Sequence, residues 1–228
     1  MKQADILEIF LSIQGEGPYV GERQIFLRFN ECNLRCGFCD VTGSKKAKKH
    51  TVNEILSKII TLNKNTGCKT ISLTGGEPLL YSDFLKILLP GLKASDFKIY
   101  LETNATLPVE LKKIKRYVNV VSADIKLPSV TNDKPQWNRH LEFLKISPKN
   151  KTFIKVIVSS QVKLQEFKMA VSMTRKINSK MPFIIQPVTK GRTVNISADK
   201  LFELQDYARS YLSKVLVIPQ IHKILGVK

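Results

Sequence analysis

Residues 69–78 read KTISLTGGEP, and they decide the fold class of this 228-residue chain. A run rich in β-branched residues ends in a Gly-Gly turn, and apolar residues recur at helical spacing after Ser82. A strand, a turn and a helix in this order form one βα unit. The same alternation predicts strands at 24–29, 69–74, 97–101, 118–123, 152–158 and 183–186, separated by stretches of helical spacing.

The predicted helices alternate with these strands. Thr51 and Glu54 form a capping box before the first helix. Further helices are expected at 109–116, 138–145, 163–176 and 197–212, with a last strand at 214–218. The longest irregular stretch, Leu127 to Trp137, contains two prolines and is expected to form a mobile loop over the site.

About six βα units are fewer than the eight of a closed barrel. We therefore expect an α/β fold, a partial (open) β/α barrel with right-handed crossovers, to which residues 6–13 add an N-terminal strand. No linker or low-complexity segment interrupts the rhythm, so residues 1–228 are expected to form a single domain. The carboxyl ends of the parallel strands are where ligands bind in such folds.

The composition indicates a folded, strongly basic chain. Hydrophobic residues make up 43%, and 37 Lys plus Arg against 19 Asp plus Glu give a formal net charge of +18. This mixture excludes disordered and collagen-like classes, and no apolar run reaches the ~18 residues of a membrane span, so we expect an unprocessed cytosolic protein. The charge fits either nucleic-acid binding or a Lys-rich surface that attracts small anions. Because no aromatic residues interleave with the lysine run at 45–49, nucleic acid is not the expected main ligand.

Three of the four cysteines lie close together after the first predicted barrel strand. Cys32, Cys36 and Cys39 form a C-x3-C-x2-C array. Three thiolates from one loop can hold three irons of a cluster and leave the fourth iron open for chemistry. The same thiolates could instead hold zinc with His50 as the fourth ligand, or remain unligated. Cys68 stands apart and is predicted to be a small buried hydrophobe.

The cysteine array, the GGEP sequence at 75–78 and the ETN sequence at 102–104 together resemble the radical S-adenosylmethionine (SAM) superfamily. The resemblance implies a [4Fe-4S] cluster whose open iron chelates SAM, and one electron that cleaves SAM to a 5′-deoxyadenosyl radical. It implies that Cys32, Cys36 and Cys39 hold the cluster. The implied SAM contacts are Phe38, Asp40, Gly75, Gly76, Glu77, Glu102, Asp124, Lys126 and Gln186.

Both ends of the chain carry a closer resemblance. Residues 8–10, 12–17 and 26–28 read EIF, SIQGEG and FLR, residues 219–223 read PQIHK, and all are similar to the 7-carboxy-7-deazaguanine synthase family. The resemblance implies contraction of the ring of 6-carboxy-5,6,7,8-tetrahydropterin with loss of ammonia, on the route to queuosine or archaeosine. It also implies a homodimer and a reductant protein such as flavodoxin or ferredoxin. The implied substrate-binding residues are Ile13, Gln14, Gly15, Glu16, Arg28 and Thr74.

The chemistry of these residue types suits that substrate. An amide at Gln14 and a carboxylate at Glu16 could hydrogen-bond the donor and acceptor edge of a pterin. The guanidinium of Arg28 could clamp a carboxylate with two parallel hydrogen bonds. The alternative for Arg28 is a surface ion pair with Glu31 or Glu22.

The sequence departs from the family pattern in two places. Val41 stands where the family has a hydroxyl that binds magnesium, and an isopropyl group cannot coordinate that cation. A magnesium site would have to use Thr42, backbone, the substrate carboxylate and water, or be absent. Ala105 replaces the usual glycine after Glu-Thr-Asn, and His222 fits either a structural or a catalytic role.

Two other functions remain open at this level. One is a radical SAM enzyme with another target, such as an activase that makes a glycyl radical on a partner protein. The other is a basic zinc module that binds RNA. A brown protein containing iron and sulfide would reject the zinc module.

Overall fold

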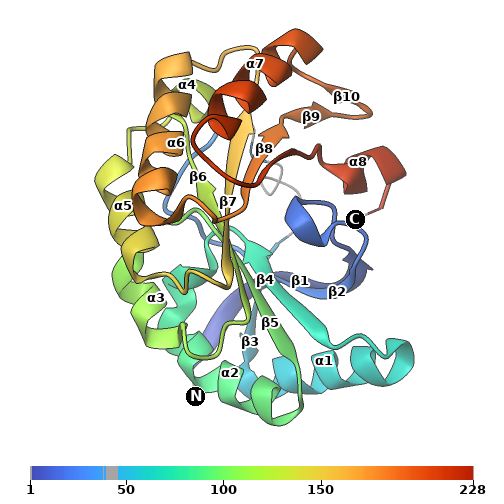
Figure 1. Cartoon of the computed structure of the whole chain (residues 1–228). Helices are drawn as coiled ribbons and strands as arrows, with labels where there is room; N and C mark the ends of the chain where they lie inside the picture. Colours follow the sequence, from blue (N-terminus) through green and yellow to red (C-terminus); the bar gives the residue numbers. More distant parts are fainter. Residues whose placement is uncertain (1, 38, 40–45, 228) are drawn as a thin grey trace.

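The computed structural model describes residues 2–37, 39 and 46–227, and its centre is one curved sheet (Figure 1). Within the described residues the sheet has nine strands in the order β11-β8-β7-β6-β5-β4-β2-β1-β3. The parallel strands are β2 (Arg23–Phe29), β4 (Thr70–Gly75), β5 (Lys98–Thr103), β6 (Val120–Ile125), β7 (Thr152–Val158), β8 (Phe183–Pro187) and β11 (Val215–Val217). β1 (Gln3–Ile13) runs antiparallel to β2, and β3 (Lys48–Thr51) runs antiparallel to β1. The two end strands of this order do not pair, so the expectation of an open α/β barrel is confirmed.

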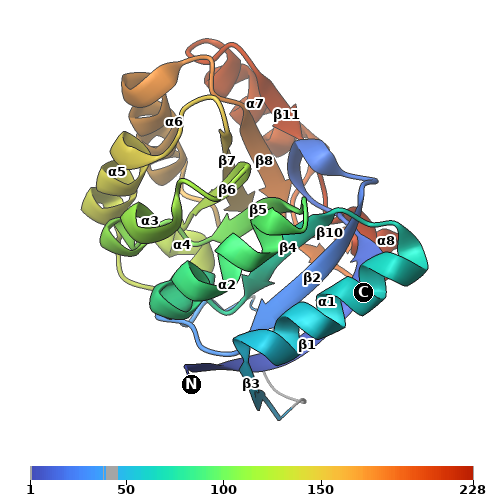
Figure 2. The ribbon, with the colours of Figure 1, turned by 90° about the horizontal axis from the view of Figure 1, so that it is seen from below.

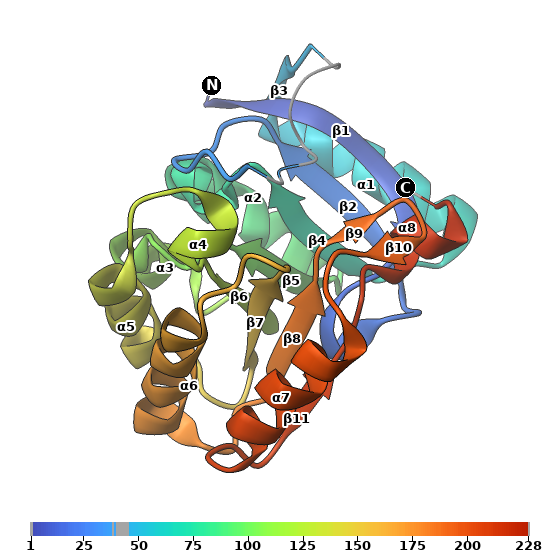
Figure 3. The same cartoon turned by 90° about the horizontal axis from the view of Figure 1, so that it is seen from above.

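The larger helices cover the outer side of the sheet, as the views from below and above show (Figures 2 and 3). The helices are α1 (Val52–Thr66), α2 (Ser82–Ala94), α3 (Pro108–Ile114), α4 (Pro128–Thr131), α5 (Trp137–Ile146), α6 (Leu164–Asn178), α7 (Ala198–Arg209) and α8 (Ile221–Leu225). Two 3-10 turns, η1 (Gly17–Tyr19) and η2 (Pro78–Tyr81), and a hairpin of β9 (Thr189–Lys190) and β10 (Thr193–Val194) complete the described elements. No helix of the described chain is long and apolar enough to cross a membrane.

Local sequence signals explain the ends of α1. The backbone N–H of Glu54 donates to Thr51 Oγ1 at 3.4 Å, and the backbone N–H of Thr51 donates to Glu54 Oε2 at 2.7 Å. This is the predicted capping box. The helix ends at Thr66, and the capping residue Gly67 has a φ of 68°, which favours glycine.

The core lies between the outer face of the sheet and the helices, and a smaller cluster lies on the inner face. Tyr100, Phe153 and Ile184 form this inner cluster, and Tyr19 of η1 packs on it. The Tyr19 ring centroid lies 5.4 Å from that of Tyr100 and 6.2 Å from that of Phe153. The segment after β1 therefore enters the barrel and fills its interior near the amino ends of the strands. Ligand space remains at the carboxyl ends.

The stretch expected to be a mobile loop contains α4 and holds the cysteine loop. The backbone N–H of Gly37 donates to the carbonyl of Thr131 at 2.9 Å, and that of Arg35 donates to Asp133 Oδ2 at 3.1 Å. Trp137 begins α5 and packs against the main core. The expectation of an irregular stretch was wrong for residues 128–131, because Pro128 takes the first position of α4, where a proline favours a helix.

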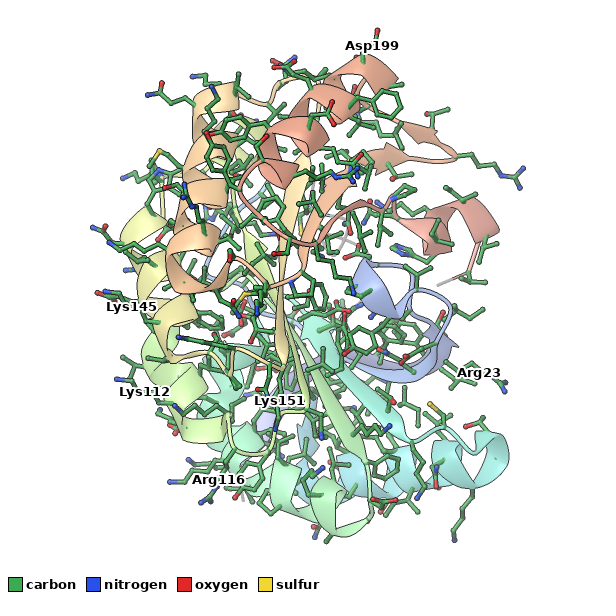
Figure 4. The ribbon with its side chains drawn as sticks, viewed as in Figure 1. Arg23, Lys112, Arg116, Lys145, Lys151 and Asp199 are labelled. Atoms are coloured by element: carbon green, nitrogen blue, oxygen red, sulfur yellow. The ribbon has the colours of Figure 1, made fainter. Side chains whose placement is uncertain are left out.

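Charged side chains on the outer helices account for part of the basic surface. The labelled Lys112, Arg116 and Lys145 point away from the sheet (Figure 4).

Candidate active site

A cavity of about 350 Å³ lies at the carboxyl ends of the central parallel strands. Parallel strands bring their carboxyl ends to one edge, so segments that are distant in sequence meet there. The predicted site residues that line it are Ile13, Gln14, Gly15, Glu16, Arg28, Cys32, Cys36, Cys39, Thr74, Gly75, Gly76, Glu102, Asp124 and Lys126. Phe38, Asp40, Val41 and Thr42 lie outside the described residues, and the predictions for them stay predictions.

The three clustered cysteines face this cavity. Cys32 Sγ accepts from the backbone N–H of Leu34 at 3.4 Å and from Asn104 Nδ2 at 3.8 Å, and such donors are typical around cluster sulfurs. Burial raises the pKa of the Cys36 thiol to about 11, so a metal must displace the proton when it binds. Within the described residues, no three His, Cys, Asp or Glu side chains are arranged to hold a metal ion. The chemistry of the donor set, three thiols that line one cavity, fits a cluster held by three thiolates, although the described side chains are not gathered around one point in this structure.

Gly75, the last residue of β4, and Gly76 pack directly on the backbone that leads into the cysteine loop. The backbone N–H of Gly76 donates to the carbonyl of Phe29 at 2.9 Å. A Cβ at Gly75 would lie 2.2 Å from that carbonyl oxygen, and one at Gly76 would lie 2.0 Å from the carbonyl oxygen of Glu31. Gly75 also has a φ of 109°. Both glycines are therefore required by this close approach, and both line the cavity.

Glu77 lies behind the cavity wall, with a side chain that is 0% exposed. Its carboxylate accepts from Leu79 N at 3.0 Å, Thr103 Oγ1 at 2.8 Å and Asn104 N at 2.7 Å. Burial raises its pKa to about 7 against the effect of these three hydrogen bonds. Glu77 holds the end of β5 to the turn after β4. It lines no part of the cavity, and neither does the buried Gln186, so the SAM contacts predicted for them stay predictions.

Glu102 joins the predicted SAM side of the cavity to the predicted substrate side. Its Oε1 accepts from Gln14 Nε2 at 2.8 Å and from Ser72 Oγ at 3.3 Å, and its Oε2 accepts from Thr74 Oγ1 at 2.6 Å. Gln14 and Thr74 were both predicted as substrate contacts. The orientation of either side chain therefore depends on the Glu102 carboxylate.

A chain of buried charges crosses the cavity floor. Glu16 forms an ion pair with Lys155 and accepts from Gln220 Nε2 at 2.8 Å. Asp124 Oδ2 lies 3.5 Å from Lys155 Nζ and 2.7 Å from Lys126 Nζ. Burial alone would raise the pKa of Glu16, but the Lys155 ammonium lowers it to about 2. The sequence analysis did not identify Lys155 as a site residue. A lysine in the otherwise apolar strand TFIKVIV is nevertheless a signal of a buried functional charge.

Arg28 pairs with a different carboxylate from the two considered. Its Nη1 lies 2.5 Å from Glu8 Oε1 on the neighbouring strand, and its guanidinium carbon lies 5.0 Å from the Phe10 ring centroid. The alternative prediction, an ion pair of Arg28 with Glu31 or Glu22, is therefore wrong. Arg28 lines the cavity, and its buried Nε has no hydrogen-bond partner among the described residues.

The C-terminal segment closes the open side of the barrel over Gly15. The backbone N–H of Ile221 donates to the Gly15 carbonyl at 3.0 Å, and a Cβ at Gly15 would lie 2.2 Å from His222 Nδ1. His222 therefore packs on the segment that carries Gln14 and Glu16. The lining residues that were not assigned to the site from the sequence are Phe26, Leu34, Thr103, Asn104, Ser122, Lys155, Ile157, Val188, Thr189, Lys190, Gln220, His222 and Lys223.

His50 and Cys68, which the sequence analysis considered, do not line the cavity, and neither does His140 of α5. His50 is on the edge strand β3, with Nδ1 3.7 Å from Glu54 Oε2, so the structure gives the proposed zinc ligand no place among the lining residues. Cys68 is buried, as expected, and its Sγ donates to the carbonyl of Arg23 at 3.2 Å. His140 is buried between two loops of the site.

Comparisons with known proteins agree with this geometry. The family model for the radical SAM superfamily matches residues 27–158. The 7-carboxy-7-deazaguanine synthase of Geobacter sulfurreducens is 34% identical over 98% of this chain and 97% of that protein. That of Methanopyrus kandleri is also 34% identical, over 97% of this chain and 93% of its own. The crystal structure of QueE from Escherichia coli has a TM-score of 0.65 at 18% identity and covers 96% of this chain and 94% of its own, which supports the fold.

Proposed function

The chain belongs to the radical SAM superfamily and, within it, to the 7-carboxy-7-deazaguanine synthase family, and we propose that its cavity binds 6-carboxy-5,6,7,8-tetrahydropterin and forms 7-carboxy-7-deazaguanine with release of ammonia. Members of the superfamily use a [4Fe-4S] cluster and SAM, and the protein is a radical SAM lyase. When bound, these two groups supply the radical that removes a hydrogen from the substrate. The residues of the chain bind the reactants, orient them and exclude water.

One observation carries the proposal: the three thiols and the polar groups suited to a pterin line the same cavity of about 350 Å³. Because the thiols and these polar groups share one cavity, the radical would form next to its target, which limits side reactions. A glycyl-radical activase must instead admit a segment of a partner protein. The described residues at the cavity include closely paired buried charges that suit a small polar molecule better than a peptide.

The cofactor side comprises the strand ends next to the cysteine loop. We assign the cluster to Cys32, Cys36 and Cys39. SAM contacts are assigned to Gly75, Gly76, Glu102, Asp124 and Lys126. The glycines offer backbone that a ligand can approach closely. Glu102 Oε2 accepts one hydrogen bond, from Thr74, and keeps a lone pair for a ribose hydroxyl.

The substrate side comprises the segment after β1 and the neighbouring strand ends. We assign the pterin edge to Gln14 and Glu16, with Thr74 beside them. Arg28 is assigned to the substrate carboxylate because its guanidinium lines the cavity, while Glu8 fixes the orientation of that guanidinium. Both oxygens of Glu16 already accept one hydrogen bond, and each has a further lone pair for the substrate.

Four further properties belong to this proposal. A flavodoxin or ferredoxin would supply the electron, the enzyme would act as a homodimer, and it would work in the cytoplasm, where thiols stay reduced. Magnesium would bind only if Thr42, backbone and the substrate carboxylate replace the hydroxyl that Val41 lacks. Light scattering tests the dimer, and turnover after chelation tests magnesium.

The decisive experiment is turnover by anaerobically purified, reconstituted enzyme. Iron and sulfide are measured first, and the protein is then incubated with SAM, a reductant and 6-carboxy-5,6,7,8-tetrahydropterin. We expect mass spectrometry to detect 7-carboxy-7-deazaguanine. A colourless protein that binds zinc, or SAM cleavage with no conversion of this pterin, would reject the proposal.

A further inference from the structure

Lys155 is a buried cation in a place where charge is costly. It lies in the middle of β7, whose seven residues are all buried, and it is 6% exposed. Removing an ammonium from water costs several kcal/mol unless close carboxylates compensate. A leucine or methionine would fill the same strand position without this cost. The lysine therefore requires an explanation beyond packing.

The two carboxylates that compensate Lys155 come from opposite sides of the cavity. Glu16 lies on the segment after β1, on the proposed substrate side, and pairs with Lys155 directly. Asp124 ends β6, on the proposed SAM side, with Oδ2 3.5 Å from Lys155 Nζ. Lys126 shares that oxygen at 2.7 Å, so Asp124 keeps a cation without Lys155. Glu16 has no such second partner at hydrogen-bonding distance among the described cations.

The other groups that face Glu16 cannot replace Lys155. Gln220 donates a neutral hydrogen bond from the segment before α8, and His222 of α8 makes only the weakest of the contributions that lower the pKa of Glu16. Tyr100 and Glu102 of β5 also face the pair formed by Glu16 and Lys155. Neither of these is a cation. The low pKa of Glu16 therefore depends chiefly on Lys155.

We propose that Lys155 is a positioning residue for pterin recognition, which holds the Glu16 carboxylate in place for the substrate and ties it to Asp124 on the SAM side. The inference rests on the proposed function. Lys155 is not assigned as an acid or base, because Glu16, Asp124 and Glu102 raise its pKa despite burial and keep it protonated. Without Lys155, burial would act on Glu16 unopposed and raise the pKa that now lies at about 2.

The first test removes the positive charge of Lys155 and keeps a long, unbranched side chain at this position. In reconstituted enzyme, we expect Lys155→Met to raise the KM for the pterin by about tenfold to a hundredfold, since hydrogen bonds to charged groups are worth that much. The pH profile of kcat/KM should gain a new acid limb as Glu16 titrates. Iron content and SAM cleavage without pterin should change by less than about threefold. Lys155→Arg keeps the charge and should keep the wild-type pH profile.

Lys151→Met is the matched control, because Lys151 directly precedes β7 but its side chain is exposed, at the opposite end of the strand from the site (Figure 4). It should leave the KM and the pH profile unchanged. If Lys155→Met folds poorly, the double variant Glu16→Gln with Lys155→Met removes both charges and avoids an unpaired one. In a double-mutant cycle with Glu16→Gln, the effects on KM should be strongly non-additive.

Two results would overturn the inference: additive effects of the two substitutions on KM, or a Lys155→Met enzyme with the wild-type pH profile. A wild-type enzyme that does not convert the pterin would overturn the proposed function instead, and the inference with it. The wild-type measurement therefore separates the two failures.

Discussion

His140 links two loops of the site and should remain neutral well below the pH at which a histidine normally gains its proton. The side chain, on α5, is 0% exposed. Its Nε2 accepts from the backbone N–H of Lys126 at 3.3 Å, so Nδ1, 3.1 Å from the carbonyl oxygen of Ala105, carries the proton. A second proton on the ring would break the bond to Lys126. Burial lowers the pKa of His140 from 6.5 to about 4.

The size and sign of the effect follow from this difference. Each pKa unit corresponds to ~1.4 kcal/mol, so the shift is worth roughly 3 kcal/mol in total. Between pH 6.5 and about 4 the unfolded chain binds the proton at this position and the folded chain does not. The free energy of unfolding therefore falls as the pH is lowered through this window and is unaffected by His140 above it. Lowering the pH from 7 to 5 should therefore reduce the free energy of unfolding by roughly 2 kcal/mol through this residue.

Two measurements check this prediction. In protein with labelled histidine, NMR should show a ring that titrates near pH 4, and His140→Asn should remove that resonance and leave those of His50 and His222. Denaturant unfolding at pH 7 and pH 5 should then show a loss of stability in the wild type that is roughly 2 kcal/mol larger than in the variant. Titration of His140 near pH 6.5, or equal pH dependence in both proteins, would refute the reasoning.

Three further substitutions test separate parts of the structure. Gly76→Ala should abolish iron incorporation, because its Cβ would meet backbone at 2.0 Å, whereas Gly91→Ala meets only the movable side chain of Leu56 at 3.1 Å and should retain iron. Arg28→Ala should reduce pterin turnover far more than SAM cleavage without pterin, and equal loss of both would remove Arg28 from the substrate site. Thr51→Ala should lower the free energy of unfolding by about 1 kcal/mol, measured by denaturant, with unchanged iron content; no loss would contradict the capping box.

Local sequence was sufficient for the βα units and their order. The strand predicted at 152–158 has the same bounds in the structure, and the capping box at Thr51 is present. Periodicity and capping depend on residues that are neighbours along the chain, so they can be read without knowing the fold. The cysteine array and the Gly-Gly turn are also local motifs, and the structure places both in the cavity lining.

The sequence by itself therefore determined an open βα barrel, the family, and about half of the residues that line the cavity. Only the tertiary structure decided how those side chains are paired. Lys155 pairs with Glu16, which is 139 residues away in the sequence, and Glu102 accepts a hydrogen bond from Gln14, which is 88 residues away. The positions of η1 inside the barrel and of α8 on Gly15 could not be predicted from the sequence either. Such pairings depend on which distant segments the folded sheet brings within a few ångströms, and no local pattern encodes that distance.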